Sequence, residues 1–212
     1  MTTTSQMATL YNDKKAASEL RRYRDKGPIP STKALIDSLI GEGVEGATVL
    51  DIGGGIGAIQ HDLLEAGAAH VTSVDASASY LAAAREETTR RGVEDRVTYR
   101  HGDFVELAES VPPADIVTLD RVLNVYPEWK RLVELSSVRA QRVYGLVYPR
   151  NTAMVRFVIL VMNLILRLKR KSVRAAIRPA DEIERIARAN GLVPHASQDV
   201  GPAWHVVVYR RG

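Results

Sequence analysis

The chain has 212 residues, of which 45% are hydrophobic and 25% charged, which suits one folded domain with its own core. It contains no cysteine, so a disulfide framework and any thiolate metal site or nucleophile are excluded. The formal net charge of +4 favours anionic partners and is equally typical of an ordinary basic surface. We expect a cytoplasmic protein, because residues 1–15 lack the apolar core of a signal peptide.

The first 30 residues predict an N-terminal helical cap. Residues 1–8 are rich in Thr and Ser and predict a loose start, whereas residues 9–26 are strongly charged and helical in pattern up to a Gly-Pro stop. A second helix is expected over 32–40, after a Ser/Thr cap. We expect the cap to fold over a bound ligand, with Tyr23 as a candidate contact; a merely solvated helix is the alternative.

From residue 31 to the end, the sequence predicts a single domain in which apolar strands alternate with helices. The expected strands cover 47–52, 70–75, 97–103, 115–120, 142–149, 192–198 and 203–210, and the expected helices cover 56–66, 77–91, 127–139 and 179–191. This alternation is typical of a Rossmann-like, doubly wound α/β fold with a mostly parallel sheet. The last two strands have no helix between them, so they should form an antiparallel hairpin at one edge.

One helical insertion, over 151–178, interrupts the alternation. Its most apolar stretch, 157–168, is shorter than the ~20 residues of a membrane-spanning helix. Long insertions in compact domains are often lids. Apolar and basic residues mix over 155–174, which favours contact with a membrane surface or a greasy substrate. A helix buried on the domain or at a homodimer interface explains the pattern as well. Nucleic acid is not expected, because aromatic residues do not interleave with the basic ones.

The stretch "VLDIGGGIGAIQ" leads the first strand into a glycine-rich turn. Glycine at 53, 54, 55 and 57 permits a tight turn and close approach of a ligand to the backbone, so Gly53, Gly54, Gly55 and Gly57 are candidate cofactor-binding residues. Their spacing also fits a dinucleotide turn. Asp51 distinguishes the ligands, because a carboxylate repels a pyrophosphate but attracts the ammonium and sulfonium of S-adenosylmethionine.

Two further acidic residues end the next two strands. Asp75, followed by Ala76, is placed to accept hydrogen bonds from both hydroxyls of a ribose. Asp103, preceded by Gly102, can accept from the amino group of adenine, and Phe104 offers an apolar wall beside it. Acids at the ends of three successive strands are a specific pattern for a nucleoside ligand.

These stretches resemble the motifs of class I S-adenosylmethionine-dependent methyltransferases. "LDIGGGIG" is similar to motif I, "VTSVDAS" to the acidic second motif, "HGDF" to the adenine motif and "ADIVTLDRVL" to the fourth. The resemblance covers residues 45–150 and implies S-adenosylmethionine as the cofactor and a seven-stranded sheet with a reversed last strand. The C-terminal part, from "YGLVYPRN" onward, resembles magnesium-protoporphyrin O-methyltransferases, and we do not carry the porphyrin substrate over.

The loop after the fourth strand, "LDRVLNVYPEW", is expected to face the transferred methyl group. Asp120 is a candidate for cofactor binding and catalysis. Tyr126 is a candidate catalytic residue, although its pKa near 10 must fall before it can act as a base. Methyl transfer from a sulfonium needs chiefly proximity and in-line geometry, so a base is not required, and both residues could simply hold the loop. The candidate acceptor-binding residues are Tyr23, Arg121, Asn124, Tyr126 and Arg150.

We expect no metal site, because the histidines lack HxxxH spacing and the acids lack a metal-loop pattern. The acceptor is expected to be a small molecule, hydrophobic or anionic, methylated on O, N, C or S by a monomer or homodimer. Two other functions stay open. An NAD(P)-dependent oxidoreductase is disfavoured by Asp51 and by the lack of a Tyr-x-x-x-Lys pair. A noncatalytic partner subunit would keep the fold and bind another protein through the insertion.

Overall fold

In the computed structural model of the chain, residues 12–169 and 173–212 are described. The loose start expected over 1–8 lies outside these residues. Seven strands form one sheet: β1 (Thr48–Ile52), β2 (His70–Asp75), β3 (Val97–His101), β4 (Ala114–Asp120), β5 (Ala140–Pro149), β6 (Leu192–Val200) and β7 (Trp204–Arg211). Their order across the sheet is β3-β2-β1-β4-β5-β7-β6. The first five strands pair in parallel, and β7 is antiparallel to both β5 and β6. The expected Rossmann-like sheet and C-terminal hairpin are confirmed.

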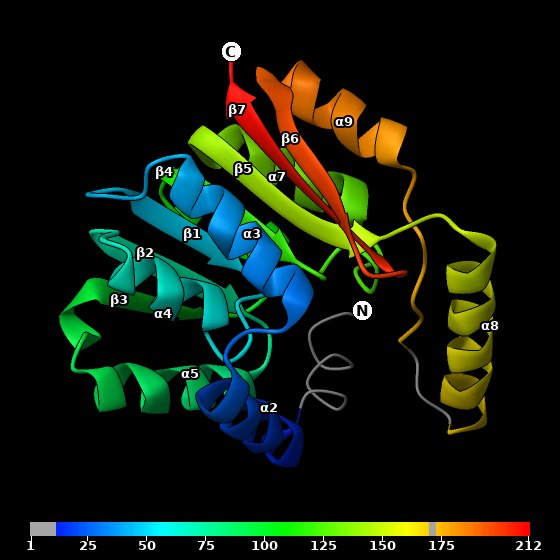
Figure 1. The fold of residues 1–212 in the computed structure, drawn as a ribbon, viewed down its shortest axis with the longest axis horizontal. Coiled ribbons are helices and arrows are strands. Elements are labelled where there is room, and N and C mark those ends of the chain that lie inside the picture. Colours follow the sequence, from blue (N-terminus) through cyan, green and yellow to red (C-terminus); the bar gives the residue numbers. More distant parts are fainter. Residues whose placement is uncertain (1–11, 170–172) are drawn as a thin grey trace.

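Helices cover both faces of this sheet (Figure 1). They are α2 (Asp13–Lys26), α3 (Pro30–Gly41), α4 (Ala58–Glu65), α5 (Ala78–Arg91), α6 (Phe104–Leu107), α7 (Trp129–Arg139), α8 (Ala153–Leu168) and α9 (Ala180–Ala189). Apolar side chains of α3 and α4 form a core on one face, and those of α7 and α9 form a core on the other. Strand residues facing alternate sides contribute to both cores, as the two-residue period of a strand requires.

Strand and helix boundaries differ from the sequence expectation at the turns beyond the carboxyl ends of the strands. The helix expected from residue 56 begins only at Ala58, because Gly57 has a φ of 81° and lies in the left-handed region. The strand expected to reach residue 103 ends at His101. Gly102 turns the chain there, and the side chain of Asp103 then caps the short helix α6, which the periodicity did not predict.

The helical insertion is present as α8, which stands at one edge of the molecule beyond the end of β5 (Figure 1). Of its own residues only Val155 is buried. Among the described residues, no helix is long and apolar enough to cross a membrane. The return segment 173–179 carries no regular structure and leads back to α9.

Candidate active site

A cavity of about 660 Å³ opens at the carboxyl ends of the parallel strands. Its wall is formed by the glycine turn after β1, the ends of β2 and β4, the α2–α3 connection and the loop 121–126. The strand order reverses between β1 and β4, and ligands of doubly wound sheets bind at this reversal. The cavity is therefore the first candidate for a ligand site.

The glycine turn cannot carry side chains. Gly53 has a φ of 70°, and a Cβ there would lie 2.5 Å from Cγ2 of Val122. A Cβ on Gly54 would lie 2.7 Å from both Oδ2 of Asp51 and Oγ of Ser73. Bare backbone is thus presented to the cavity by residues 53–55. Gly57 differs from the expectation: it lies outside the cavity lining, where it precedes α4 and packs against the side chains of that helix.

Asp51 lies beneath this turn and is 1% exposed. Its Oδ1 accepts a hydrogen bond of 2.7 Å from Oγ1 of Thr118. Its Oδ2 has no hydrogen-bond partner within the described part of the chain, and neither has Oγ of Ser73. Burial raises the pKa of Asp51 to about 7, against the opposing effect of the Thr118 hydrogen bond. A buried carboxylate with an unsatisfied oxygen is suited to a cationic ligand in the cavity and unsuited to a pyrophosphate.

Asp75 ties the glycine turn to the end of β2. Its Oδ2 accepts from the backbone N–H of Gly55 at 2.9 Å, and its Oδ1 accepts from the N–H of Ser77 at 2.7 Å. Burial raises its pKa, while these two backbone hydrogen bonds oppose the shift. Each carboxylate oxygen has a second lone pair, so Asp75 can still accept hydrogen bonds from two hydroxyls. Ala76 lines the cavity beside it.

Asp103 and Tyr126 close one end of the cavity, together with Gly102 and the buried ring of Phe104. Oδ1 of Asp103 accepts from the backbone N–H of Val105 at 3.0 Å and from the hydroxyl of Tyr126 at 2.5 Å. Burial and then Asp103 raise the pKa of Tyr126 above its ordinary value. The base role considered for Tyr126 needs a lowered pKa, which this environment opposes. Tyr126 instead holds the carboxylate of Asp103 in place.

The loop after β4 is anchored to helix α3 through Asp120. Oδ2 of Asp120 accepts from Oγ1 of Thr32 at 2.5 Å, and its Oδ1 accepts from Nε of Arg121 at 3.2 Å. Arg121 has a φ of 59°, and such a left-handed conformation in a residue other than glycine often marks a functional turn. Oδ1 of Asn124, also in the cavity wall, has no hydrogen-bond partner among the described residues. It is therefore a candidate acceptor of a hydrogen bond from a bound molecule.

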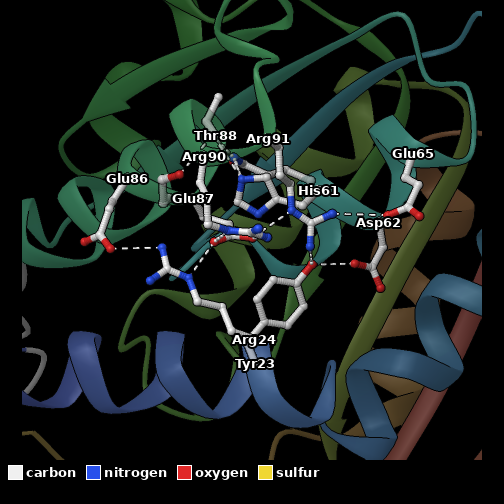
Figure 2. Close-up of polar contacts among 12 residues, drawn as sticks. Tyr23, Arg24, His61, Asp62, Glu65, Glu86, Glu87, Thr88, Arg90 and Arg91 are labelled. Carbon is white, nitrogen blue, oxygen red and sulfur yellow. Dashed lines mark hydrogen bonds and ion pairs between the residues drawn. The ribbon is translucent and has the colours of Figure 1, made fainter.

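Tyr23 brings the cap helix α2 into the cavity wall. Figure 2 shows its side chain reaching from α2 toward Asp62 and Arg91. Its hydroxyl donates to Oδ1 of Asp62 at 2.5 Å and accepts from Nη2 of Arg91 at 3.1 Å. Burial, followed by the bond to Asp62, raises the pKa of Tyr23 above its usual value. The hydroxyl is thus committed to α4 and α5, and the ring is what remains available to a ligand.

A second anchor of α2 lies beside Tyr23, where the carboxylate of Glu87 on α5 is fully enclosed (Figure 2). Arg24 of α2 donates to it at 2.8 Å, and Arg90 and Arg91 donate at 2.5 and 2.8 Å. The hydrogen bond from Arg90, followed by those from Arg91 and Arg24, holds the pKa of Glu87 well below its usual range. These contacts fix the cap against the domain at one wall of the cavity.

Arg150 lies outside this cavity, in contrast to its expected place in the acceptor pocket. Its Nη2 pairs with Oδ2 of Asp199 at 2.8 Å, and its Nη1 donates to the carbonyl of Gly201. It lines a separate, more open cavity of about 960 Å³ between the end of β5 and α8. The hairpin that pairs with β5 supplies these partners, and that distant pairing left no local sequence signal.

Several residues of the cavity wall were not predicted from the sequence, among them Thr32, Met162 and Trp204. Thr32 was interpreted only as part of a helix cap, and Trp204 and Met162 come from β7 and α8. Only the tertiary fold brings these last two to the site. Within the described residues, no group of three His, Asp or Glu side chains is arranged to hold a metal ion.

Comparison with known proteins agrees with this geometry. Residues 49–140 match the family model of a methyltransferase domain. The chain is 35% identical over 123 residues to ribosomal protein L11 methyltransferase of Alteromonas mediterranea. The matched stretch covers 55% of this chain and 42% of that protein. The same-named protein of Desulforamulus reducens is 32% identical over 99 residues, covering 47% of this chain and 32% of the relative. The chain therefore spans less than half the length of these relatives.

Solved structures share the fold. Magnesium protoporphyrin IX methyltransferase of Synechocystis PCC 6803, solved with bound S-adenosylmethionine, superposes with a TM-score of 0.72 over 100% of this chain and 99% of that one, at 18% identity. The [4+2]-cyclase SpnF superposes with a TM-score of 0.71 over 99% of this chain and 97% of that one, at 16% identity. The resemblance found in the sequence is thus confirmed for the domain and for the fold.

Proposed function

Because residues 49–140 form a methyltransferase domain in the fold of S-adenosylmethionine-dependent methyltransferases, we propose that the protein methylates a small, largely apolar acceptor from S-adenosylmethionine. The observation that carries the cofactor assignment is the buried carboxylate of Asp51, whose Oδ2 lacks a partner among the described residues beneath a turn of bare backbone. A cation in the cavity compensates this charge, whereas the pyrophosphate of a dinucleotide would be repelled.

The residues present fit the parts of that cofactor. Asp51 and the backbone of residues 53–55 would hold its methionine end, and the free lone pairs of Asp75 would accept from its ribose hydroxyls. Asp103 and Phe104 would enclose the adenine. The cap, residues 1–30, and the insertion, residues 151–178, would border the acceptor on the methyltransferase domain 31–212. A cytoplasmic location is part of the proposal, in line with a chain without cysteine.

The acceptor end of the cavity favours an apolar molecule. It is bordered by side chains from the loop after β4, from β7 and from α8: Val122, Val125, Trp204 and Met162. Arg121 and Asn124 are the polar groups there that would orient the acceptor. A cavity of about 660 Å³ that would also hold the cofactor leaves room for a small molecule or for one side chain of a larger one.

Positioning would supply most of the catalysis. When bound, S-adenosylmethionine would supply a methyl group on a sulfonium that departs as a neutral thioether, so the barrier falls mainly through alignment. Thr32, Asp120 and Arg121 would hold the loop that faces the methyl group. Tyr126 would take no proton at neutral pH, because its pKa is raised, and it would support Asp103 instead.

A protein side chain is the second candidate acceptor, because both curated relatives are named for methylation of ribosomal protein L11. The match to these relatives spans less than half of their length. The name of these relatives therefore makes a protein acceptor worth testing, and experiment must choose between it and a small molecule.

Calorimetric titration tests the cofactor first. We expect S-adenosylhomocysteine to bind in the micromolar range and NADH and NADPH not to bind. Asp75→Ala should abolish the binding, and Asp37→Ala, which removes an exposed acid on α3, should leave it unchanged. Binding of a dinucleotide, or of no nucleotide at all, would refute the proposal.

Transfer of a labelled methyl group then distinguishes the acceptors. We expect transfer to apolar phenols, amines or carboxylic acids and none to purified ribosomal protein L11. Transfer to L11 alone would replace the small-molecule acceptor with a protein. Cofactor binding with no transfer to any acceptor, together with a stable heteromer, would favour the noncatalytic partner subunit.

A further inference from the structure

Helix α8 exposes most of the large apolar side chains found on the surface of the described residues. Twelve such side chains are exposed there, and nine belong to this one helix: Met154, Phe157, Val158, Leu160, Val161, Met162, Leu164, Ile165 and Leu168. Soluble surfaces rarely leave a contiguous apolar patch of this kind without a function. The patch borders the candidate site and lies outside the residues that would hold the cofactor.

The exposed side chains form a continuous stripe, which we call the apolar face of α8. Phe157, Val161, Leu164 and Leu168 follow a spacing of four, three and four residues, so they share one side of the helix. They are 65%, 39%, 56% and 75% exposed. In Figure 1, α8 stands at the edge of the molecule, and the other described elements lie on one side of it.

The opposite side of α8 faces the protein. Val155 is buried there, and Asn163 forms two hydrogen bonds with the backbone of Ala175 in the return segment, at 2.8 and 2.9 Å. The helix is thus held in a fixed rotation, with its apolar face outward. Burial against the domain, which the sequence left open, does not occur within the described residues.

The α8 segment of the sequence carries charge of a single sign, and the nearby acids Asp181 and Asp199 line the neighbouring cavity, where Asp199 pairs with Arg150. From residue 150 to residue 180 the sequence contains no Asp or Glu. It contains eight basic residues: Arg150, Arg156, Arg167, Lys169, Arg170, Lys171, Arg174 and Arg178. A second copy of the chain packed on this face would bring a matching set of cations close together, at a cost in electrostatic repulsion. An anionic surface would instead be attracted.

We propose that α8 docks the protein on an anionic membrane surface, with its apolar face placed at the boundary between lipid headgroups and acyl chains. A helix of 16 residues is about 24 Å long, which is shorter than the ~30 Å hydrocarbon core, so it lies on the membrane. Apolar side chains on one side and basic residues along its borders are the features of an interfacial helix. Each Lys or Arg near anionic lipid strengthens such binding several-fold.

This docking face is connected to the mouth of the candidate site. Met162 of α8 lines the cavity, and the N–H of Ala176 donates to the carbonyl of Asn124 at 2.7 Å. Arg178 donates to the carbonyls of Leu123 and Tyr126. The return segment therefore links α8 to the loop that would hold the acceptor. If the proposed methyl transfer is right, an acceptor dissolved in the membrane would enter next to α8; the docking itself does not depend on that function.

Vesicle flotation of the full chain tests the docking without any turnover. We expect binding to vesicles of phosphatidylcholine with 30% phosphatidylglycerol, weakened by added salt, and little binding to pure phosphatidylcholine. The double variant Phe157→Ser/Leu164→Ser should bind at least tenfold more weakly. Val138→Ser, a matched loss of an exposed apolar side chain on α7, should bind like the wild type.

Two double variants test the contribution of the basic residues. Arg167→Gln/Lys169→Gln should weaken binding to the anionic vesicles at least fivefold, and Lys33→Gln/Arg188→Gln, which removes two exposed cations on α3 and α9, should not. Circular dichroism of each variant must match the wild type, as expected for exposed positions.

Equal binding to both kinds of vesicle, or none to either, would overturn the proposal. So would a homodimer that Phe157→Ser/Leu164→Ser dissociates in the absence of lipid. Loss of S-adenosylhomocysteine binding alone would refute the proposed function and leave the docking intact.

Discussion

The glycine turn and helix α8 border the same cavity, but they hold their positions in opposite ways. The turn is fixed by short contacts: a buried carboxylate below it, backbone hydrogen bonds from Gly55 to Asp75 and from Gly53 to the carbonyl of Val74, and no room for a Cβ at Gly53 or Gly54. Helix α8 has one buried side chain and is attached mainly through Asn163. The difference suggests that the cofactor end is preorganised, while the acceptor end is left accessible to an external surface.

The largest effect should come from filling the turn. Gly53→Ala should abolish measurable binding of S-adenosylhomocysteine, because the new Cβ would lie 2.5 Å from Cγ2 of Val122 at a φ of 70°. Gly92→Ala is the matched control: it has a φ of 66° with no atom within 4 Å, so it tests the backbone conformation alone. Calorimetry should show unchanged binding for Gly92→Ala and a loss of about 1 kcal/mol in stability. If Gly53→Ala bound S-adenosylhomocysteine as tightly as the wild type, the glycine turn would not be the rigid part of the site.

The buried charge of Asp51 should make stability depend on pH. Its pKa is raised from 3.8 to about 7 by burial, so the folded state binds more protons than the unfolded state between these values. The unfolding free energy therefore falls as pH rises from about 4 to about 7, and this contribution is fully present only below pH 4. At about 1.4 kcal/mol per pKa unit the loss reaches roughly 4 kcal/mol.

Urea unfolding of wild type and Asp51→Asn from pH 4 to pH 8 isolates this group. The wild type should lose stability relative to the variant as the pH rises, and S-adenosylhomocysteine should bind more tightly to the wild type above pH 7. A difference between the two proteins that does not change with pH would show that Asp51 is already ionised when the cavity holds no ligand.

The anchor of the cap should have an intermediate effect. Glu87→Gln removes the enclosed charge that three arginines surround, and we expect a loss of about 2 kcal/mol. Glu86→Gln is the matched control, because Glu86 is 63% exposed and pairs with Arg24 at the surface; its effect should stay below about 0.5 kcal/mol. Thermal unfolding of both variants measures the difference. Equal effects would mean that α2 is held by its apolar contacts instead.

These contrasts also explain what could be predicted from the sequence. The cofactor end is encoded locally: strands end in acids, and glycines follow the first strand, so Asp51, Asp75 and Asp103 were found where they lie. The mostly parallel sheet and the C-terminal hairpin followed from the alternation of elements, whereas the order of the strands came only from the structure.

The acceptor end depends on long-range contacts. Arg150 was placed in the wrong cavity because its partner Asp199 lies in the hairpin, 49 residues away by subtraction. Tyr126 was considered as a base because its spacing does not reveal the bond to Asp103 that raises its pKa. Met162 and Trp204 carry no motif, and only packing brings them to the cavity.

The smallest effect on stability should be found on α8, and it tests directly whether this helix is held less firmly than the glycine turn. Leu168→Ser replaces a side chain that is 75% exposed and should change the unfolding free energy by less than about 0.5 kcal/mol. Leu119→Ala, at a fully buried position of β4, should cost about 2–5 kcal/mol. Urea unfolding of the two variants measures both. A small loss would show that Leu168 adds little to the fold of the isolated chain, as expected for a side chain on the face that we assign to a membrane surface. A large loss with Leu168→Ser in the absence of lipid would show that the helix is buried in solution, most simply against a second chain.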